Sequence, residues 1–152
     1  MKILLVDDSA KHRRAGVEQL TVLGHEVVAL SDYTEALERA MGGEYFDAAL
    51  LDLLMPAEAT MLGDSGMALL GQPFAVGYAL AVLIALAGVP FVAVATDTNH
   101  HNHPASAVMD WFPRSTIQIE DSKVIFMHAP LCAGGEKNWA LILERVTQKI
   151  RE

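Results

Sequence analysis

The stretch "KILLVDDS", residues 2 to 9, joins a short apolar run to two aspartates and a serine. A run that is apolar at consecutive positions predicts a strand covered on both faces, as in a parallel sheet. Ser9 is a favoured N-cap residue for a helix, Val17 and Leu20 follow at helical spacing, and Gly24 provides a stop. The stretch therefore predicts a strand followed by a helix, with both aspartates at the carboxyl end of the strand.

The rest of the chain repeats this strand and helix unit. Further strands are predicted at residues 25–31, 46–52, 91–96 and 123–128, and further helices at 34–41, 74–87 and about 136–150. Alternating strands and helices predict the α/β class, here a doubly wound, five-stranded parallel sheet between two layers of helices. No linker or repeat divides the sequence, so residues 1–152 are predicted to form one domain.

Two connections are longer than ordinary loops. They cover residues 53 to about 72, after the third strand, and 97–122, after the fourth. Within the second, Pro104 is expected to start a short helix that reaches Asp110. The following "STIQIEDSKVIF" (115–126) alternates apolar and polar residues on both sides of a turn, which predicts a hairpin. Both insertions are expected to overhang the carboxyl edge of the sheet.

Composition excludes several classes of partner. The formal net charge is -8 and the eleven lysines and arginines are scattered, which argues against binding to nucleic acid or to an anionic membrane. Cys132 is the single cysteine, so an intramolecular disulfide is excluded. The first residues become acidic too early for a secretory signal peptide, and we expect a cytoplasmic protein.

One uncharged segment, residues 74–95, is long enough to cross a bilayer. Gly88 and Pro90 interrupt it, however, and a proline disfavours a continuing helix, so the segment predicts a helix followed by a strand of a soluble domain. The helix at 74–87 is apolar on every side, whereas a helix that covers a sheet normally has a polar outer face. Either the long insertions or a second copy of the chain must cover it, and we expect a homodimer through this helix.

Polar side chains gather at one edge of the predicted sheet. Asp7 and Asp8 end the first strand, Asp52 ends the third, and Thr96 ends the fourth. The carboxyl ends of parallel strands lie at the same edge, where such sheets bind ligands. Three carboxylates that converge repel one another unless a cation neutralises them, and Mg²⁺ prefers oxygen ligands of this kind. The pattern predicts a Mg²⁺ site suited to phosphoryl chemistry.

The sequence resembles the receiver domain of two-component response regulators. The resemblance rests on "LLVDDS" (4–9), "DAALLDLLMP" (47–56) and "VAVAT" (92–96). It implies a flavodoxin-like fold, Mg²⁺ bound by the acids and the carbonyl of one further residue, and a partner histidine kinase that phosphorylates an aspartate. Carried over to this sequence, Asp7, Asp8, Asp52 and the Leu54 carbonyl hold the metal, Asp52 is the phosphoacceptor, Thr96 is the switch hydroxyl and Phe126 is the switch aromatic. In the same way, "DSGMALL" (64–70) looks like the start of the third helix of a receiver, displaced by an insertion.

The sequence departs from the receiver pattern after the fifth strand. Receivers have a lysine followed by a proline there, and this chain has "FMHAP" (126–130), with Ala129 at the position of the lysine. Loss of that ammonium removes electrostatic stabilisation of a transferring phosphoryl group. This departure makes a degenerate receiver, one that acts without phosphate, a competing hypothesis.

Three histidines, His100, His101 and His103, lie within four positions of the second insertion. Their spacing permits a Zn²⁺ site in a loop. Two alternatives remain open, namely a solvated loop that caps the helix at Pro104, and imidazoles that reach over the acidic edge and replace the absent lysine.

We therefore expect a stand-alone, atypical receiver that binds Mg²⁺ and signals through contacts with a sensor kinase or a downstream protein. Its activity as an enzyme would be at most the self-catalysed phosphorylation and dephosphorylation of Asp52. The competing class is a metal-dependent phosphohydrolase that uses the same acids together with the histidines. A third hypothesis is a scaffold whose acids bind nothing.

Overall fold

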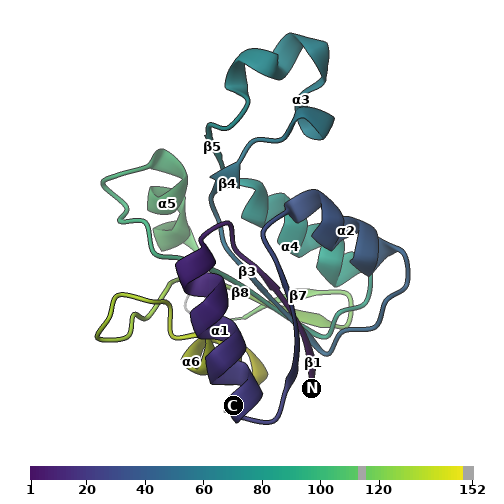
Figure 1. Ribbon diagram of the computed structural model, residues 1–152. Coiled ribbons are helices and arrows are strands. Elements are labelled where there is room, and N and C mark those ends of the chain that lie inside the picture. Colours follow the sequence, from purple (N-terminus) through teal and green to yellow (C-terminus); the bar gives the residue numbers. More distant parts are fainter. Residues whose placement is uncertain (113–115, 149–152) are drawn as a thin grey trace.

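The computed structural model describes residues 1–112 and 116–148, and the part described is built on one six-stranded sheet (Figure 1). The strand order is β2-β1-β3-β6-β8-β7. Five strands are parallel: β1 (Lys2–Val6), β2 (Glu26–Leu30), β3 (Ala48–Leu51), β6 (Phe91–Thr96) and β8 (Ser122–His128). The sixth, β7 (Ile117–Ile119), pairs antiparallel with β8 and forms the predicted hairpin. The predicted doubly wound α/β sheet is confirmed, with one added edge strand.

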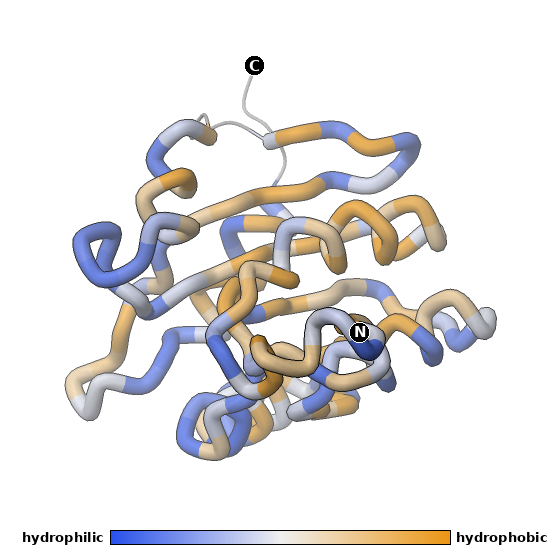
Figure 2. Tube along the Cα trace, turned by 90° about the horizontal axis from the view of Figure 1, so that it is seen from above, coloured by the Kyte–Doolittle hydropathy of each residue, from blue (hydrophilic) through white to orange (hydrophobic). Residues whose placement is uncertain are grey.

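Four helices cover the two faces of the sheet. Helices α1 (Ala10–Val22) and α6 (Trp139–Thr147) lie on one face, and α2 (Tyr33–Met41) and α4 (Val76–Leu86) lie on the other. Successive strand residues point to opposite faces, so Leu5 and Leu50 pack under α1 and α6, while Leu4 and Leu51 pack under α2 and α4. Figure 2 shows the resulting hydrophobic strands through the middle of the molecule and hydrophilic segments toward the outside. The last helix ends at Thr147, and the part predicted beyond residue 148 lies outside the described residues.

The first insertion forms an arm that projects from the carboxyl edge of the sheet (Figure 1). Its base is a two-stranded ribbon of β4 (Met55–Pro56) and β5 (Pro73–Phe74). The ribbon carries α3 (Ala59–Gly66) and the short helix η1 (Met67–Leu69), neither of which has a buried residue. The interpretation of residues 64–70 as the third helix of a receiver is therefore wrong, because that segment lies on the arm and covers none of the sheet.

Helix α4, predicted at residues 74–87, covers the sheet between β3 and β6. Its first turn lies against the end of β3. There the N–H of Gly77 donates to the carbonyl of Leu53, the residue after Asp52, at 3.0 Å. A Cβ at Gly77 would lie 2.5 Å from the backbone oxygen of Asp52, so only glycine lets the helix approach this closely. The close approach fixes the start of α4 against the strand end that carries Asp52.

The uncharged segment 74–95 divides as predicted, into α4 and β6. Within the described residues, no helix combines the length and the apolar character that a bilayer crossing requires. Helix α4 buries Leu80 and Ile84 against the sheet, but Val82, Leu83 and Leu86 on its outer face are 38–54% exposed. The predicted apolar outer face of this helix is thus present.

The second insertion contains the predicted short helix. Helix α5 (Pro104–Val108) continues into the single turn η2 (Met109–Trp111). Pro104 occupies the first helical turn, and the Nδ1 atom of His103 accepts the N–H of Ala105 at 3.1 Å. His103 is therefore the N-cap of α5, as one of the alternatives for the histidines proposed.

Candidate functional site

The carboxylates predicted to converge do meet at the carboxyl edge of the sheet. Asp7 follows β1 and Asp52 follows β3, and these neighbouring strands pair Val6 with Leu51, so the two aspartates lie side by side. One oxygen each from Asp7, Asp8 and Asp52 lies within 4.8 Å of the other two. Asp7 and Asp52 are buried, and Asp8 is exposed.

A buried lysine neutralises part of this charge. The Nζ atom of Lys137 donates to Oδ2 of Asp7 and to Oδ1 of Asp52, both at 2.7 Å. The lysine side chain has no exposed surface. From the sequence no lysine was expected at the site, because Ala129 stands directly after the fifth strand. The structure corrects this conclusion, since the ammonium arrives from a position eight residues further along the chain.

The loop between β8 and α6 folds back on itself and brings Lys137 to the site. The N–H of Cys132 donates to the carbonyl of Glu136 at 2.7 Å, and that of Asn138 donates to the carbonyl of Pro130 at 2.8 Å. These two hydrogen bonds close the loop and bring the chain back to the sheet. Asn138 then caps α6, because its Oδ1 accepts the N–H of Leu141 at 3.0 Å.

Asp97 and His12 add a fourth carboxylate and an imidazole that the sequence analysis missed. Nε2 of His12 lies 2.9 Å from Oδ2 of Asp97, and Nδ1 of His12 accepts the backbone N–H of Lys137 at 3.2 Å. Because Nδ1 is an acceptor, the ring proton belongs on Nε2, where it is donated to Asp97. His12 therefore holds both the backbone of Lys137 and the side chain of Asp97 in place.

Burial and mutual repulsion set the pKa values of the acids. Burial, with a further contribution from Asp7, raises the pKa of Asp52 to about 7 against the opposing attraction of Lys137. Burial and the charge of Asp7 also raise the pKa of Asp8 above its usual value. For Lys137, burial would lower the pKa, but the charges of Asp52 and Asp7 outweigh it and raise the pKa, so the ammonium persists. For Asp97, burial alone would raise the pKa, but Lys137 and His12 outweigh it and lower the pKa.

A pocket of about 400 Å³ lies at these carboxylates. Its lining includes Asp7, Asp8, Asp52, His12 and Asp97, together with Leu54 and Pro73 at the base of the arm. Asn102 and His103 also line it. Four carboxylates thus line one small cavity, and the buried ammonium of Lys137 bonds to two of them.

The donor set fits a hard divalent cation. Lys137 occupies one oxygen of Asp7 and one of Asp52, and Ser9 N–H donates to the other Asp7 oxygen at 2.8 Å. Among the described residues, Oδ2 of Asp52 has no hydrogen-bond donor, and the exposed carboxylate of Asp8 has only its own backbone N–H, so both can reach an ion. One or two carboxylates with several waters is the arrangement that Mg²⁺ prefers.

The remaining predicted site residues lie in different places. Thr96 is buried at the end of β6, and its Oγ1 accepts the N–H of Thr98 at 3.2 Å. Phe126 stacks on Phe112 at 4.2 Å between ring centroids, away from the carboxylates. Among the described residues, His100, His101 and His103 do not form a group of three with ligand atoms within 4.8 Å. His103 alone lines the pocket.

Comparisons with known proteins agree with this architecture. A response regulator receiver protein from Sinorhizobium medicae superimposes with a TM-score of 0.60 over 97% of this chain and 92% of its own, at 17% identity. A response regulator from Burkholderia pseudomallei, described with a phosphorylated aspartic acid, a calcium ion and citrate, gives 0.56 over 97% and 66%, at 20% identity. The chain has the receiver-domain fold.

The sequence comparisons match a smaller part of the chain than the structural comparisons do. No protein-family model matches the chain. The probable transcriptional regulator ycf27 of Pyropia yezoensis is 44% identical over 55 residues, which are 36% of this chain. The match spans only 22% of that regulator. The predicted receiver-like fold is confirmed.

Replacement of Lys137 by methionine tests its place in the site. Removing one partner of a buried ion pair leaves uncompensated charge, and we expect the free energy of unfolding to fall by about 3–5 kcal/mol at neutral pH without divalent metal. Denaturation in urea measures this loss. Lys123→Met is the control, because among residues 1–112 and 116–148 that lysine bonds only to the carbonyl of Gln148, at the other end of the strand, and about 0.5 kcal/mol is expected. Equal effects of the two substitutions would show that the buried contacts of Lys137 contribute nothing.

Proposed function

We propose that the chain is a receiver module of two-component signalling, which binds Mg²⁺ at Asp7, Asp8 and Asp52 and accepts a phosphoryl group on Asp52. The observation that carries this proposal is the contact of Lys137 with both Asp7 and Asp52. A receiver-like fold alone does not specify phosphorylation, and the apparent lack of a lysine was the reason to expect a phosphate-independent scaffold. The buried ammonium removes that reason.

The residues have distinct tasks in phosphoryl transfer. Oδ2 of Asp52 is the carboxylate oxygen without a hydrogen-bond donor among the described residues, so it is the atom that attacks phosphorus. The new O–P bond forms as the bond between phosphorus and the donor's leaving atom breaks. Lys137 lies where negative charge develops on the phosphoryl oxygens and stabilises it. Bound Mg²⁺ would supply further positive charge, held by Asp7, Asp8, Asp52 and the Leu54 carbonyl.

Thr96 is the side chain that we assign to sensing the phosphoryl group. It is buried beside the pocket, and its hydroxyl accepts a hydrogen bond from the N–H of Thr98, in the loop that lines the pocket. Movement of this hydroxyl toward a phosphoryl oxygen would release that N–H and alter the loop. Phe126, two strand positions before His128, belongs to the cluster with Tyr78 and Phe112 through which such a change would pass.

The phosphodonor partner is a sensor histidine kinase, as the receiver fold favours. The Burkholderia pseudomallei protein with the same fold carries a phosphorylated aspartic acid and a calcium ion, which supports a phosphoacceptor and a divalent cation at the corresponding edge here. A phosphohydrolase is less well supported, because of the three histidines it would use only His103 lines the pocket.

Substitution of the phosphoacceptor gives the direct test. Asp52→Asn removes the attacking carboxylate, and we expect it to abolish Mg²⁺-dependent binding of beryllofluoride and labelling by acetyl phosphate. Intact-protein mass spectrometry measures the labelling, with the exposed Asp64→Asn on the arm as a control that stays fully active. Labelling that persists in Asp52→Asn would refute the assignment, and release of product over many turnovers would indicate a phosphohydrolase instead.

Mg²⁺ binding should depend on pH. With a folded pKa of about 7, against about 3.8 in the unfolded chain, Asp52 keeps a proton between these values that the metal must displace. The apparent affinity for Mg²⁺ should therefore rise about tenfold from pH 6 to pH 8, as the carboxylate becomes ionised. In the metal-free protein, stability should fall from about pH 4 to pH 7, because over this interval the folded state still holds a proton on Asp52 that the unfolded chain has already lost.

Isothermal titration calorimetry at both pH values measures this dependence. Two buffers with different ionisation enthalpies report the released proton directly. Asp52→Asn should bind Mg²⁺ more weakly and with less dependence on pH. An affinity that is the same at pH 6 and pH 8 would contradict a protonated Asp52.

The proposed module signals as a homodimer that forms through the outer face of α4. Val82, Leu83 and Leu86 form an exposed apolar face on α4, which is unusual for a surface helix of a monomer. We expect light scattering at micromolar concentration to give a dimer, and Leu83→Glu to give a monomer, because it places charge in the contact. Val22→Glu, on the exposed side of α1, is the control. A monomeric wild-type protein would exclude this dimer.

A further inference from the structure

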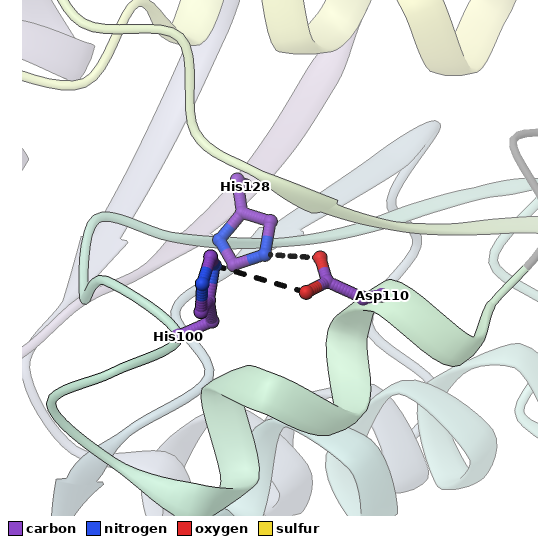
Figure 3. Close-up of side chains that lie close together, drawn as sticks. All are labelled: His100, Asp110 and His128. Atoms are coloured by element: carbon purple, nitrogen blue, oxygen red, sulfur yellow. Dashed lines mark hydrogen bonds and ion pairs between the residues drawn. The ribbon is translucent and has the colours of Figure 1, made fainter.

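A second group of metal-ligating side chains lies at the carboxyl end of β8. His100 comes from the loop after β6, Asp110 from η2, and His128 from the end of β8 (Figure 3). One ligand atom from each residue lies within 4.8 Å of the other two. We propose that His100, Asp110 and His128 bind a transition-metal ion, and that Zn²⁺ is the ion that fits best.

The distances suit tetrahedral coordination. Nε2 of His128 lies 2.9 Å from Oδ1 of Asp110, and Nδ1 of His100 lies 3.8 Å from the other oxygen of that carboxylate. Two ligands at about 2.0–2.1 Å from Zn²⁺, separated by the tetrahedral angle, are about 3.3 Å apart. The observed separations fall on either side of this value, so small side-chain rotations suffice. All three side chains are 40–54% exposed, which leaves them accessible to an ion.

The backbone holds each ligand in place without a metal. His128 pairs in register with Thr96, and the N–H of Ala129 donates to the Thr96 carbonyl at 2.8 Å. His100 lies in a turn in which Asn102 N–H donates to the Asn99 carbonyl at 2.9 Å, and the Asn99 side chain accepts His101 N–H at 2.8 Å. Asp110 lies in η2, directly after the capped helix α5. Preorganised ligands lose little freedom when an ion binds.

The ligand types separate this group from the acidic pocket. Two imidazoles with one carboxylate favour Zn²⁺ and neighbouring transition metals, whereas the carboxylates of the pocket favour Mg²⁺. Three protein ligands leave one tetrahedral position for water or another donor. The ring of His101 lies 3.9 Å from that of His100, but its nitrogens do not belong to the group. The ion-binding set thus differs from the three sequence neighbours that the loop spacing suggested.

One loop connects the two sites. Asp97, Thr98, Asn102 and His103 line the acidic pocket, and His100, within the same loop, contributes to the second group. An ion at His100, Asp110 and His128 would tie this loop to β8 and η2. The metal site itself does not depend on phosphorylation of Asp52, so the two proposals stand or fall separately.

Titration of the full chain with Zn²⁺ tests the site, with excess Mg²⁺ present to occupy the acidic pocket. We expect one Zn²⁺ per chain by calorimetry, and a visible absorption spectrum of four-coordinate ions when Co²⁺ replaces it. Each of His100→Ala, Asp110→Asn and His128→Ala should weaken Zn²⁺ binding by at least about tenfold. Because the three side chains are exposed, the metal-free melting temperatures of the variants should match the wild type.

Control variants distinguish this site from its alternatives. His25→Ala, at the opposite edge of the sheet, and His101→Ala should bind Zn²⁺ within about threefold of the wild type. Asp52→Asn should also keep the Zn²⁺ site while losing the phosphoryl analogue, which separates the two proposals. Undiminished binding in His128→Ala or Asp110→Asn would overturn the assignment. Loss of Zn²⁺ binding in His101→Ala, together with unchanged binding in His128→Ala, would also overturn the assignment.

Discussion

The buried ammonium of Lys137 is the interaction on which the site depends. Asp7 and Asp52 follow adjacent central strands and are taken out of water by the packing of α1 and α4 around them. Two buried carboxylates at this separation repel each other strongly unless a cation lies between them. Lys137 supplies that cation through two hydrogen bonds of 2.7 Å, and its Nζ lies 5.2 Å from the ring centroid of Trp139.

Holding Lys137 in this position requires several parts of the fold to cooperate. His12 on α1 accepts the backbone N–H of the lysine and contacts Asp97 beyond β6, and the carbonyl of His12 accepts the indole N–H of Trp139 at 3.0 Å. Helices α1 and α6 are thereby joined to the strand ends at the pocket. The carboxylates at the site outnumber this one ammonium, and the excess of negative charge supports the proposed divalent cation.

The arm and the loop that follows β6 lie at the carboxyl edge of the sheet, and this explains how they change the site without changing the core. The arm between β4 and β5 contributes Pro56 and Pro73 to one wall of the pocket, and the loop after β6 contributes Asn102 and His103. The hydrophobic layers on both faces of the sheet come from the regular strands and helices. Extra chain at this edge can therefore vary while the strands and their covering helices keep their packing.

The strands, most of the helices and the edge at which Asp7, Asp8 and Asp52 meet can be predicted from the sequence, because apolar runs, helix caps and strand ends are local features. Which distant side chains join these aspartates depends on the folded chain. Lys137 reaches the aspartates through a loop closed by backbone bonds, and His128 meets Asp110 and His100 across three segments. These contacts depend on how loops fold back over the sheet. The spacing of residues along a single segment does not determine that folding.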